Sequence, residues 1–249
     1  MIFGKKYIKT NFNLHYLFDK KNNENIIIHA IGCFHGTLPY LPGGDVLVIT
    51  GDITAHDTIE EYIIFNSWLN LQEYDMKIVV YGNHDKLAAD DYENKTKSKF
   101  PRPEGKNIKV LINESCEYKG ITFWGSPNTL WFQSVNPVCN AFMLKESGLN
   151  KIYKKIPEDT DVIISHGPMF GVLNTNYHNQ NCGSISLLNA VNKVKPKLLI
   201  HSHIHESFGH CLYKYQCSNK NDTKVYNVSI MDETYYPTRK YTEISLEKE

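Results

Sequence analysis

The sequence predicts an α/β fold in which buried strands alternate with helices. Short apolar runs of the length of a buried strand recur along the chain, and helix-like segments lie between several of them. Further strand-like runs indicate either one mixed sheet or two packed sheets. With 249 residues, of which 41% are hydrophobic, the chain is long enough to bury a sizeable core.

Five apolar runs are the expected buried strands. Each is rich in isoleucine, valine or leucine, as strands covered on both faces usually are, and each is followed by glycine or a polar residue. The runs are residues 25–31, 45–50, 77–81, 161–165 and 197–201.

Residues 58–71 have the pattern of an amphipathic helix. Thr58 and Glu61 stand at the spacing of a capping box, which marks the start of a helix. Large apolar side chains follow at roughly helical spacing, and we expect them to form much of one buried face. They are Ile59, Ile63, Trp68 and Leu71.

Residues 184–194 form the second expected helix. Ile185, Leu188 and Val191 recur at helical spacing. Pro196 then ends the helix, because proline cannot continue the backbone hydrogen bonding.

The remaining strand signals lie outside the five buried runs. Residues 116–127 indicate a hairpin that turns at Lys119 and Gly120. Residues 224–230 and 240–247 indicate two more strands. These additions are the reason to expect a mixed sheet or a second sheet.

We expect a single domain over residues 1–249, with residues 1–24 as an N-terminal extension of unknown role. Residues 92–107 are the most loop-like stretch, and we interpret them as an excursion within that domain. Lysine plus arginine (27) balances aspartate plus glutamate (27), so no nucleic-acid or membrane partner is indicated.

The chain is expected to be cytoplasmic. Its first residues are polar and do not resemble a secretion signal, and no apolar stretch reaches the roughly 18 residues that a membrane span needs. The six cysteines are scattered without a CxxC pair, so we expect reduced thiols and no disulfide framework.

Groups that bind divalent metals follow all five buried strands. In open α/β sheets ligands gather at the carboxyl ends of strands, and neighbouring glycines let the backbone turn sharply there. A single Gly-Asp or His-Gly dipeptide means little, because any chain of this size holds several. Five such groups in order, each at the end of an expected strand, are a specific signal for a metal site. The residues are Cys33, His35, Asp52, Asn83, His84, His166, His203 and His205.

This constellation resembles the calcineurin-like metallophosphoesterases. Their pattern of Asp-x-His, Gly-Asp, Gly-Asn-His-Asp/Glu, His and Gly-His-x-His is matched here except at two positions. The stretches "GSPNTLWF", "IPEDTDVIISHGPMFG" and "VKPKLLIHSHIHESFG" are similar to the brain-expressed branch of metallophosphoesterase-domain-containing proteins. The resemblance implies the metallo-dependent phosphatase fold, a four-layer α/β/β/α sandwich of two mixed sheets.

The resemblance also implies two divalent metal ions, which would be manganese, zinc or iron. Asp52 would bridge the two ions. Cys33, His35 and His205 would complete the first site, and Asn83, His166 and His203 would complete the second.

The activity implied is hydrolysis of a small phosphodiester, with a cyclic nucleotide as one candidate, by a hydroxide held between the metals. His84 would act as general acid, and Asp85 would orient its ring and raise its pKa. Asn83 and His84 would also bind the substrate, together with His178 in the loop 174–183. The alternative is an attenuated scaffold of the same fold that binds a nucleotide or a partner.

Cys33 is the main departure from the family pattern, which has aspartate there. A thiolate carries the same formal charge and favours zinc or iron over magnesium or manganese. Otherwise Cys33 is a small buried residue, and the first site is weak or empty. A second departure is Ser202 in place of glycine, which matters if the backbone needs a positive φ there.

Other histidines and aromatic residues have structural explanations as well as functional ones. We expect His201 and His29 to be packed within the fold. Trp124, Trp131 and Phe132 could form a platform on which a nucleobase stacks, or could pack in the core or at its rim.

Overall fold

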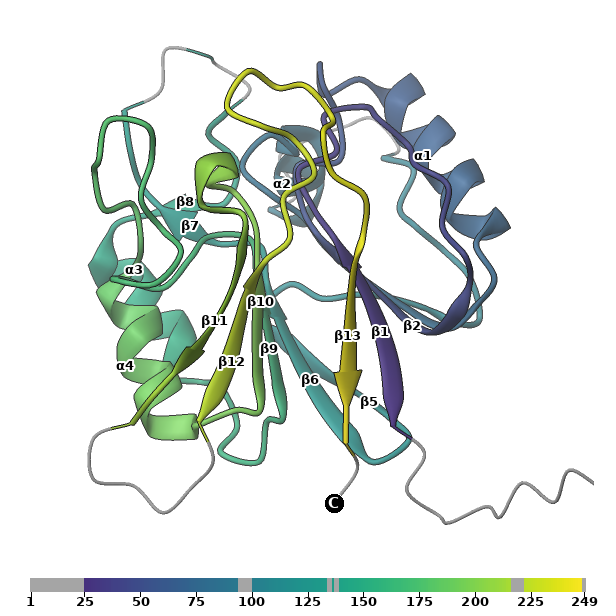
Figure 1. The fold of residues 1–249 in the computed structure, drawn as a ribbon. Coiled ribbons are helices and arrows are strands. Elements are labelled where there is room, and N and C mark those ends of the chain that lie inside the picture. The colour runs from purple at the N-terminus through teal and green to yellow at the C-terminus, as the bar shows by residue number, and fades with distance from the viewer. Residues whose placement is uncertain (1–24, 94–99, 134–135, 137–138, 216–221, 248–249) are drawn as a thin grey trace, which may run out of the picture.

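Two β-sheets lie face to face at the centre of the molecule, and helices cover both outer faces (Figure 1). The structure is a computed structural model that describes residues 25–93, 100–133, 136, 139–215 and 222–247. The extension predicted at residues 1–24 lies outside this range, so it stays a prediction. The expected four-layer α/β/β/α sandwich of two mixed sheets is confirmed.

The first sheet carries three of the predicted buried strands. Its order is β13 (Thr242–Leu246), β1 (Ile26–Ile31), β2 (Gly44–Thr50), β3 (Tyr74–Val80) and β4 (Ile108–Val110). Strands β1 to β4 are parallel, and β13 pairs with β1 in the antiparallel sense. The carboxyl ends of β1, β2 and β3 therefore lie at one edge.

The second sheet carries the other two predicted buried strands, which are parallel to each other. Its order is β11 (Gly209–Tyr213), β12 (Thr223–Asn227), β10 (Leu198–His201), β9 (Val162–Ser165), β6 (Ile121–Ser126) and β5 (Glu114–Tyr118). The two edge strands are antiparallel to their neighbours. A short separate pair is formed by β7 (Thr129–Leu130) and β8 (Met143–Leu144).

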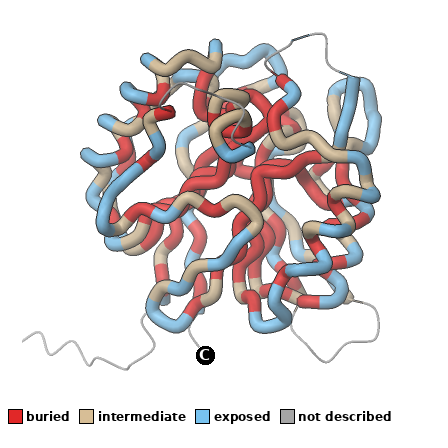
Figure 2. Tube along the Cα trace, turned by 180° about the vertical axis from the view of Figure 1, so that it is seen from behind, coloured by how far each residue is buried: buried red, intermediate tan, exposed pale blue. Residues whose placement is uncertain are grey.

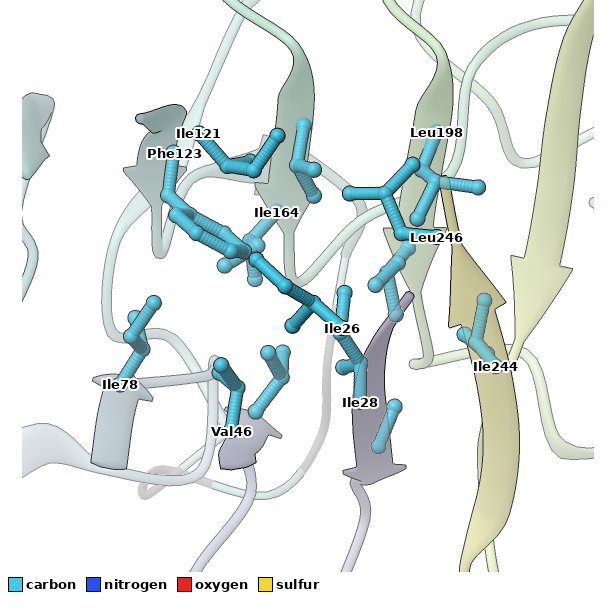
Figure 3. Close-up of a cluster of buried hydrophobic side chains, with 14 of the residues drawn as sticks. Ile26, Ile28, Val46, Ile78, Ile121, Phe123, Ile164, Leu198, Ile244 and Leu246 are labelled. Atoms are coloured by element: carbon cyan, nitrogen blue, oxygen red, sulfur yellow. The ribbon is translucent and has the colours of Figure 1, made fainter. Parts of the chain in front are cut away.

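A continuous apolar layer fills the space between the sheets (Figure 3). Ile28 and Val46 of the first sheet face Phe123, Ile164 and Leu198 of the second. Burial of apolar surface at about 25 cal/mol per Å² is the main force that holds the sheets together. The buried residues run through the interior, whereas many exposed ones lie on outer helix turns and loops (Figure 2).

Helices α1 (Ile59–Leu71) and α2 (Lys86–Tyr92) cover the first sheet. The capping box at the start of α1 is confirmed: Thr58 accepts from the Glu61 backbone, and Glu61 accepts from the Thr58 backbone. The predicted buried face was wrong for Ile63 and Leu71, which are exposed, whereas Trp68 packs against the core as expected and Ile59 is half-buried. The buried residues of α1 are Tyr62, Phe65 and Leu69. The isoleucines were misleading because the aromatic residues beside them fill the space over the sheet.

Helices α3 (Glu146–Tyr153) and α4 (Ile185–Val194) cover the second sheet. In α4, Val191 is buried as expected, but Ile185 is half-exposed and Leu187 takes its place in the core. The helix ends at Val194, before Pro196, as predicted. Among the described residues, no helix combines the length and the apolar character that crossing a bilayer requires.

The predicted hairpin turn is confirmed. Strands β5 and β6 pair in the antiparallel sense up to Tyr118 and Ile121. Lys119 and Gly120 between them have φ values of 48° and 81°, and a positive φ at both positions fits a two-residue turn of type I′.

Candidate metal centre

The candidate site lies where the carboxyl ends of strands from both sheets meet. His35 follows β1, Asp52 follows β2 and His84 follows β3, while His166 and His203 follow β9 and β10. A hollow of about 560 Å³ opens over this group. Its lining includes six of the eight residues that the sequence marks as metal-binding groups: His35, Asp52, Asn83, His84, His203 and His205.

Asp52 lies between two sets of metal-binding atoms. Its Oδ1 is 3.3 Å from His166 Nε2, and its Oδ2 is 3.7 Å from His35 Nε2. The Cys33 thiol donates to the same Oδ2 over 4.0 Å. Each carboxylate oxygen thus faces a different set, which is the position that a bridging carboxylate requires.

The two sets match the division expected from the sequence. Potential ligand atoms of Cys33, His35 and His205 lie within 4.8 Å of one another, and so do those of Asp52, His166 and His203. A third group brings His84 within the same range of His35 and Asp52. Asn83 joins the second set, because its Oδ1 is 2.8 Å from His166 Nε2.

The backbone fixes which nitrogen of two histidines is available to a metal. His166 Nδ1 donates to the Thr50 carbonyl over 2.8 Å, and His205 Nδ1 donates to the Asp232 carbonyl over 2.9 Å. A carbonyl can only accept, so Nδ1 carries a proton in both rings and Nε2 is the nitrogen turned toward the site. In His166 this Nε2 faces the oxygens of Asn83 and Asp52, and although burial lowers the pKa of the ring, the charge of Asp52 raises it above its usual value, so a cation bound there would displace a proton. Metal-binding histidines are commonly oriented in this way.

One buried nitrogen supports the fit of a cation directly. His35 Nε2 has no hydrogen-bond partner among the described residues, although it is buried. An unsatisfied buried polar atom costs free energy, and a cation beside Asp52 would satisfy it. Imidazole, thiolate, carboxylate and amide donors together suit manganese, zinc or iron.

Burial and close charges set the protonation of the site. Burial alone would raise the pKa of Asp52, but His166, His84 and His35 hold it well below the usual range. Burial lowers the pKa of His35 to about 3 and lowers the pKa of His203 well below its normal value. These side chains therefore offer a carboxylate and neutral imidazoles, which are the forms that bind metals.

Strained backbone accompanies the convergence of the strand ends. Cys33, His35, Asp52 and His203 have φ values of 52°, 43°, 54° and 71°. Residues other than glycine seldom adopt this region, and such strain concentrates at functional sites. Gly82 packs so closely that an added Cβ would lie 2.3 Å from Asp52 Oδ1.

Cys33 is fully buried beside the first set of ligands. Its sulfur accepts from the His203 backbone N–H over 3.2 Å and from the Ser229 hydroxyl over 3.6 Å. Burial, together with the charge of Asp52, raises the pKa of the thiol to about 12. The sulfur is placed to bind a cation at the first site, but it is also satisfied within the protein.

Ser202 causes no strain at the second departure from the family pattern. It is absent from the residues with positive φ among those described, so glycine is not required there. Its hydroxyl donates to the Thr50 carbonyl over 2.9 Å, which ties β10 to β2.

The His84 ring is held differently from expectation. Its Nε2 lies 2.9 Å from the sulfur of Cys139. Asp85 instead accepts from the backbone of Gly82 and Ile53 and from the Tyr62 hydroxyl, and these contacts turn its carboxylate to the loops and not to the His84 ring. The expected orienting role of Asp85 does not fit this geometry: the carboxylate anchors the loops after β2 and β3.

The remaining sequence predictions are mixed. His178 is exposed, packs on Tyr177 and does not line the hollow. His29 is buried and hydrogen-bonds to Tyr74, and His201 is fully buried, as expected for structural residues. Trp124 is a core residue, whereas Trp131 and Phe132 are exposed at the rim of a neighbouring cavity.

Two residues at the site were missed by sequence reasoning. Cys139 contacts His84, and Tyr235 lies over the site with its ring centroid 4.8 Å from those of both His35 and His205. Neither follows a strand of the buried type, so no local pattern marks them. Only the fold brings their segments to the strand ends.

Comparisons with known proteins agree with this site. The calcineurin-like phosphoesterase family model matches residues 14–207. Metallophosphoesterase domain-containing protein 1 of Homo sapiens is 33% identical over 190 residues, covering 68% of this chain and 56% of that protein. The UPF0046 protein T07D4.2 of Caenorhabditis elegans is 29% identical over 237 residues, covering 84% of this chain and 57% of that protein.

The chain therefore spans a little over half the length of these curated relatives. The crystal structure of TT1561 of Thermus thermophilus has a TM-score of 0.54 at 12% identity, covering 89% of this chain and 99% of that one, which shows a shared fold alone. The resemblance to the metallophosphoesterase-domain branch is confirmed. The chain belongs to the calcineurin-like phosphoesterases, a family of metal-dependent enzymes that hydrolyse phosphate esters.

Proposed function

We propose that this chain hydrolyses a small phosphodiester with the help of two divalent cations. The observation that supports the proposal most is the position of Asp52, whose two oxygens face two separate sets of ligand atoms. Cys33, His35 and His205 would hold one cation, and Asn83, His166 and His203 the other. Manganese, zinc and iron all suit these donors.

Bound cations would neutralise the phosphate oxygens and supply a nucleophile near neutral pH. The protein's own contribution is placement and charge. Asp52 stays ionised because nearby histidines lower its pKa. The Thr50 and Asp232 carbonyls fix the rings of His166 and His205 before any substrate arrives.

His84 is the proposed general acid. Its ring lines the hollow next to Asn83 and contacts Cys139. From there it can donate a proton to the oxygen of the departing alcohol, a role that histidine fills at neutral pH. Asn83 and His84 would also hold the phosphoryl group. A cyclic nucleotide is the first natural substrate to test, because exposed Trp131 and Phe132 lie close enough to the site to stack a base.

The direct test is hydrolysis of bis(p-nitrophenyl) phosphate after loading with Mn²⁺, Zn²⁺ or Fe²⁺ in turn. Asp52→Asn should lower turnover at least about a hundredfold, because the bridging charge is lost. Asp159→Asn, which alters an exposed carboxylate, is the matched control. Absence of hydrolysis with every metal would reject the enzymatic function.

The second candidate is a scaffold that binds a nucleotide or a partner without efficient catalysis. The observation in its favour is Cys33, whose sulfur already accepts two hydrogen bonds within the protein. Calorimetric binding of a cyclic nucleotide without turnover would support this alternative. Turnover with any of the three metals would exclude it.

A further inference from the structure

A second cavity adjoins the hollow over the metal-ligand residues. Its volume is about 720 Å³. Phe132, His203, His205 and Tyr235 line both spaces, so they are continuous along these four side chains. A ligand whose phosphate lies at Asp52 can therefore extend into this second cavity, which we call the arm cavity.

Exposed aromatic side chains surround the arm cavity. Trp131, Phe132, Tyr177 and Tyr235 are 52%, 40%, 70% and 55% exposed. Large aromatic side chains left exposed around one concave space mark a ligand-binding surface, where a flat group can stack.

Tyr235 is fixed at the junction of the two spaces by a strained turn. Its φ is 62°, and its backbone N–H donates to the Asp232 carbonyl over 3.1 Å. The Asp232 side chain accepts from the backbone of Thr234 and Tyr236 on either side. Backbone strain that the surrounding structure maintains is typical of positions with a function.

The charge of the arm cavity is negative. Glu206 and Glu233 are the charged side chains among its described lining residues, which include no lysine or arginine. The nearby Arg239 is engaged elsewhere, since its guanidinium donates to the His205 carbonyl and lies over the Phe208 ring. A second phosphate in this space would meet two carboxylates and no described lysine or arginine, while any cations at the metal centre would already be engaged by the first phosphate. Like charges at close range disfavour binding.

The position of His84 shows which part of a diester would enter the arm cavity. His84 lines the hollow over the metal-ligand residues but not the arm cavity. Since His84 is the proposed acid for the departing alcohol, the ester group that leaves would lie next to His84, away from the arm cavity. The arm cavity is then available to the other ester group, which stays on phosphorus and which we call the retained arm.

We propose that the arm cavity binds the retained arm of the diester and selects a flat, uncharged group, such as a nucleoside that carries no further phosphate. Trp131, Phe132 and Tyr235 supply the stacking surface, while Glu206 and Glu233 reject a second phosphate. Water adds at phosphorus, the bond to the leaving oxygen breaks, that oxygen takes a proton, and the retained arm departs as a phosphate monoester. This inference rests on the proposed function.

The test compares two chromogenic diesters with the same leaving group. They are thymidine 5′-(p-nitrophenyl phosphate) and the same compound with an added 3′-phosphate. With the metal-loaded full chain, we expect kcat/KM to be at least about tenfold higher for the first ester, an effect of the size that charge repulsion produces. The difference should shrink in about 0.5 M salt, because salt screens exposed charges.

The variant Glu206→Gln/Glu233→Gln should reduce the ratio of the two kcat/KM values toward one. Glutamine at 206 keeps the oxygen that accepts from the Tyr177 backbone N–H. Glu117→Gln on the edge strand β5 removes a distant exposed charge and is the matched control. Thermal unfolding midpoints show whether the variants fold.

Equal kcat/KM for the two esters, or a ratio that the double variant leaves unchanged, would overturn the inference while the proposed function stands. Failure to hydrolyse either ester or bis(p-nitrophenyl) phosphate would overturn the proposed function and the inference with it.

Discussion

In the proposed metal centre, Cys33 would set which metals the first site prefers. Its sulfur lies among ligand atoms of His35 and His205, at the position where the family has a carboxylate. Sulfur is a softer ligand than oxygen, so it favours zinc and iron over manganese and magnesium. As a ligand, ionised Cys33 would change the metal preference of the site while keeping the formal charge of a carboxylate.

Cys33→Asp should shift the metal preference of the enzyme. We expect the ratio of turnover with Mn²⁺ to turnover with Zn²⁺ to rise by about tenfold, because the oxygen ligand suits the harder cation. The measurement is the initial rate on bis(p-nitrophenyl) phosphate after loading with each metal. Cys211→Asp on the edge strand β11 is the control. An unchanged ratio would show that Cys33 is not a ligand.

In the proposed mechanism Cys139 would act through His84, because its sulfur lies 2.9 Å from Nε2 of that ring. Cys139→Ala should lower kcat by about tenfold for a diester with an alkyl leaving group, which needs a well-placed acid. A p-nitrophenyl ester should be affected less, since its leaving group departs without protonation. Cys139→Ser, which keeps a hydrogen-bonding group, should recover part of the loss. Equal losses for both esters would mean that Cys139 supports the fold alone.

At the scale of the elements, the site depends on how closely the strand ends approach each other. Gly32 follows β1 and lies against Thr50 of β2 and Ser202 after β10. An added Cβ would lie 2.0 Å from Thr50 Oγ1 and 2.7 Å from Ser202 Oγ. The strand ends of the two sheets therefore approach each other at Gly32, where there is no room for a side chain.

Gly32→Ala should destabilise the protein by about 1–3 kcal/mol, the usual cost of overpacking a buried position. Urea unfolding followed by circular dichroism measures the change. Gly148→Ala in α3 is the control, since its added Cβ would be 3.3 Å from the nearest side-chain atom and alanine favours a helix. If Gly32→Ala were as stable as the wild type, the sheets would have room to adjust at this edge.

The elements, and the clustering of polar side chains at the strand ends, were largely predictable because local signals encode them. Apolar runs marked the strands, Thr58 and Glu61 marked the start of α1, and Lys119 with Gly120 marked the hairpin turn. The buried face of α1 was not predictable, because it depends on how Tyr62 and Phe65 pack against the sheet. Contacts such as Cys139 with His84 join distant segments, and no local pattern contains them.

At the scale of the whole molecule, folding keeps several histidines uncharged in the interior. His201 ends β10 and is fully buried, and its Nε2 has no hydrogen-bond partner among the described residues. Burial lowers its pKa from 6.5 to about 4. As the pH falls through 6.5, the imidazole of the unfolded chain takes up a proton while the folded protein does not. Acid therefore favours unfolding. Proton uptake by His201 in the unfolded chain lowers the free energy of unfolding as the pH falls from about 6.5 to about 4.

The contribution of His201 can be isolated by comparing metal-free wild type with His201→Leu. Between pH 7 and pH 5, the wild type should lose about 2 kcal/mol more unfolding free energy than the variant, because the variant has no imidazole to protonate at this position. Urea unfolding at both pH values measures the loss, and the other buried histidines cancel because both proteins contain them. Exposed His178→Leu should behave like the wild type. Equal losses in wild type and His201→Leu would mean that His201 takes up its proton in the folded state, and that the acid sensitivity of the fold arises from other groups.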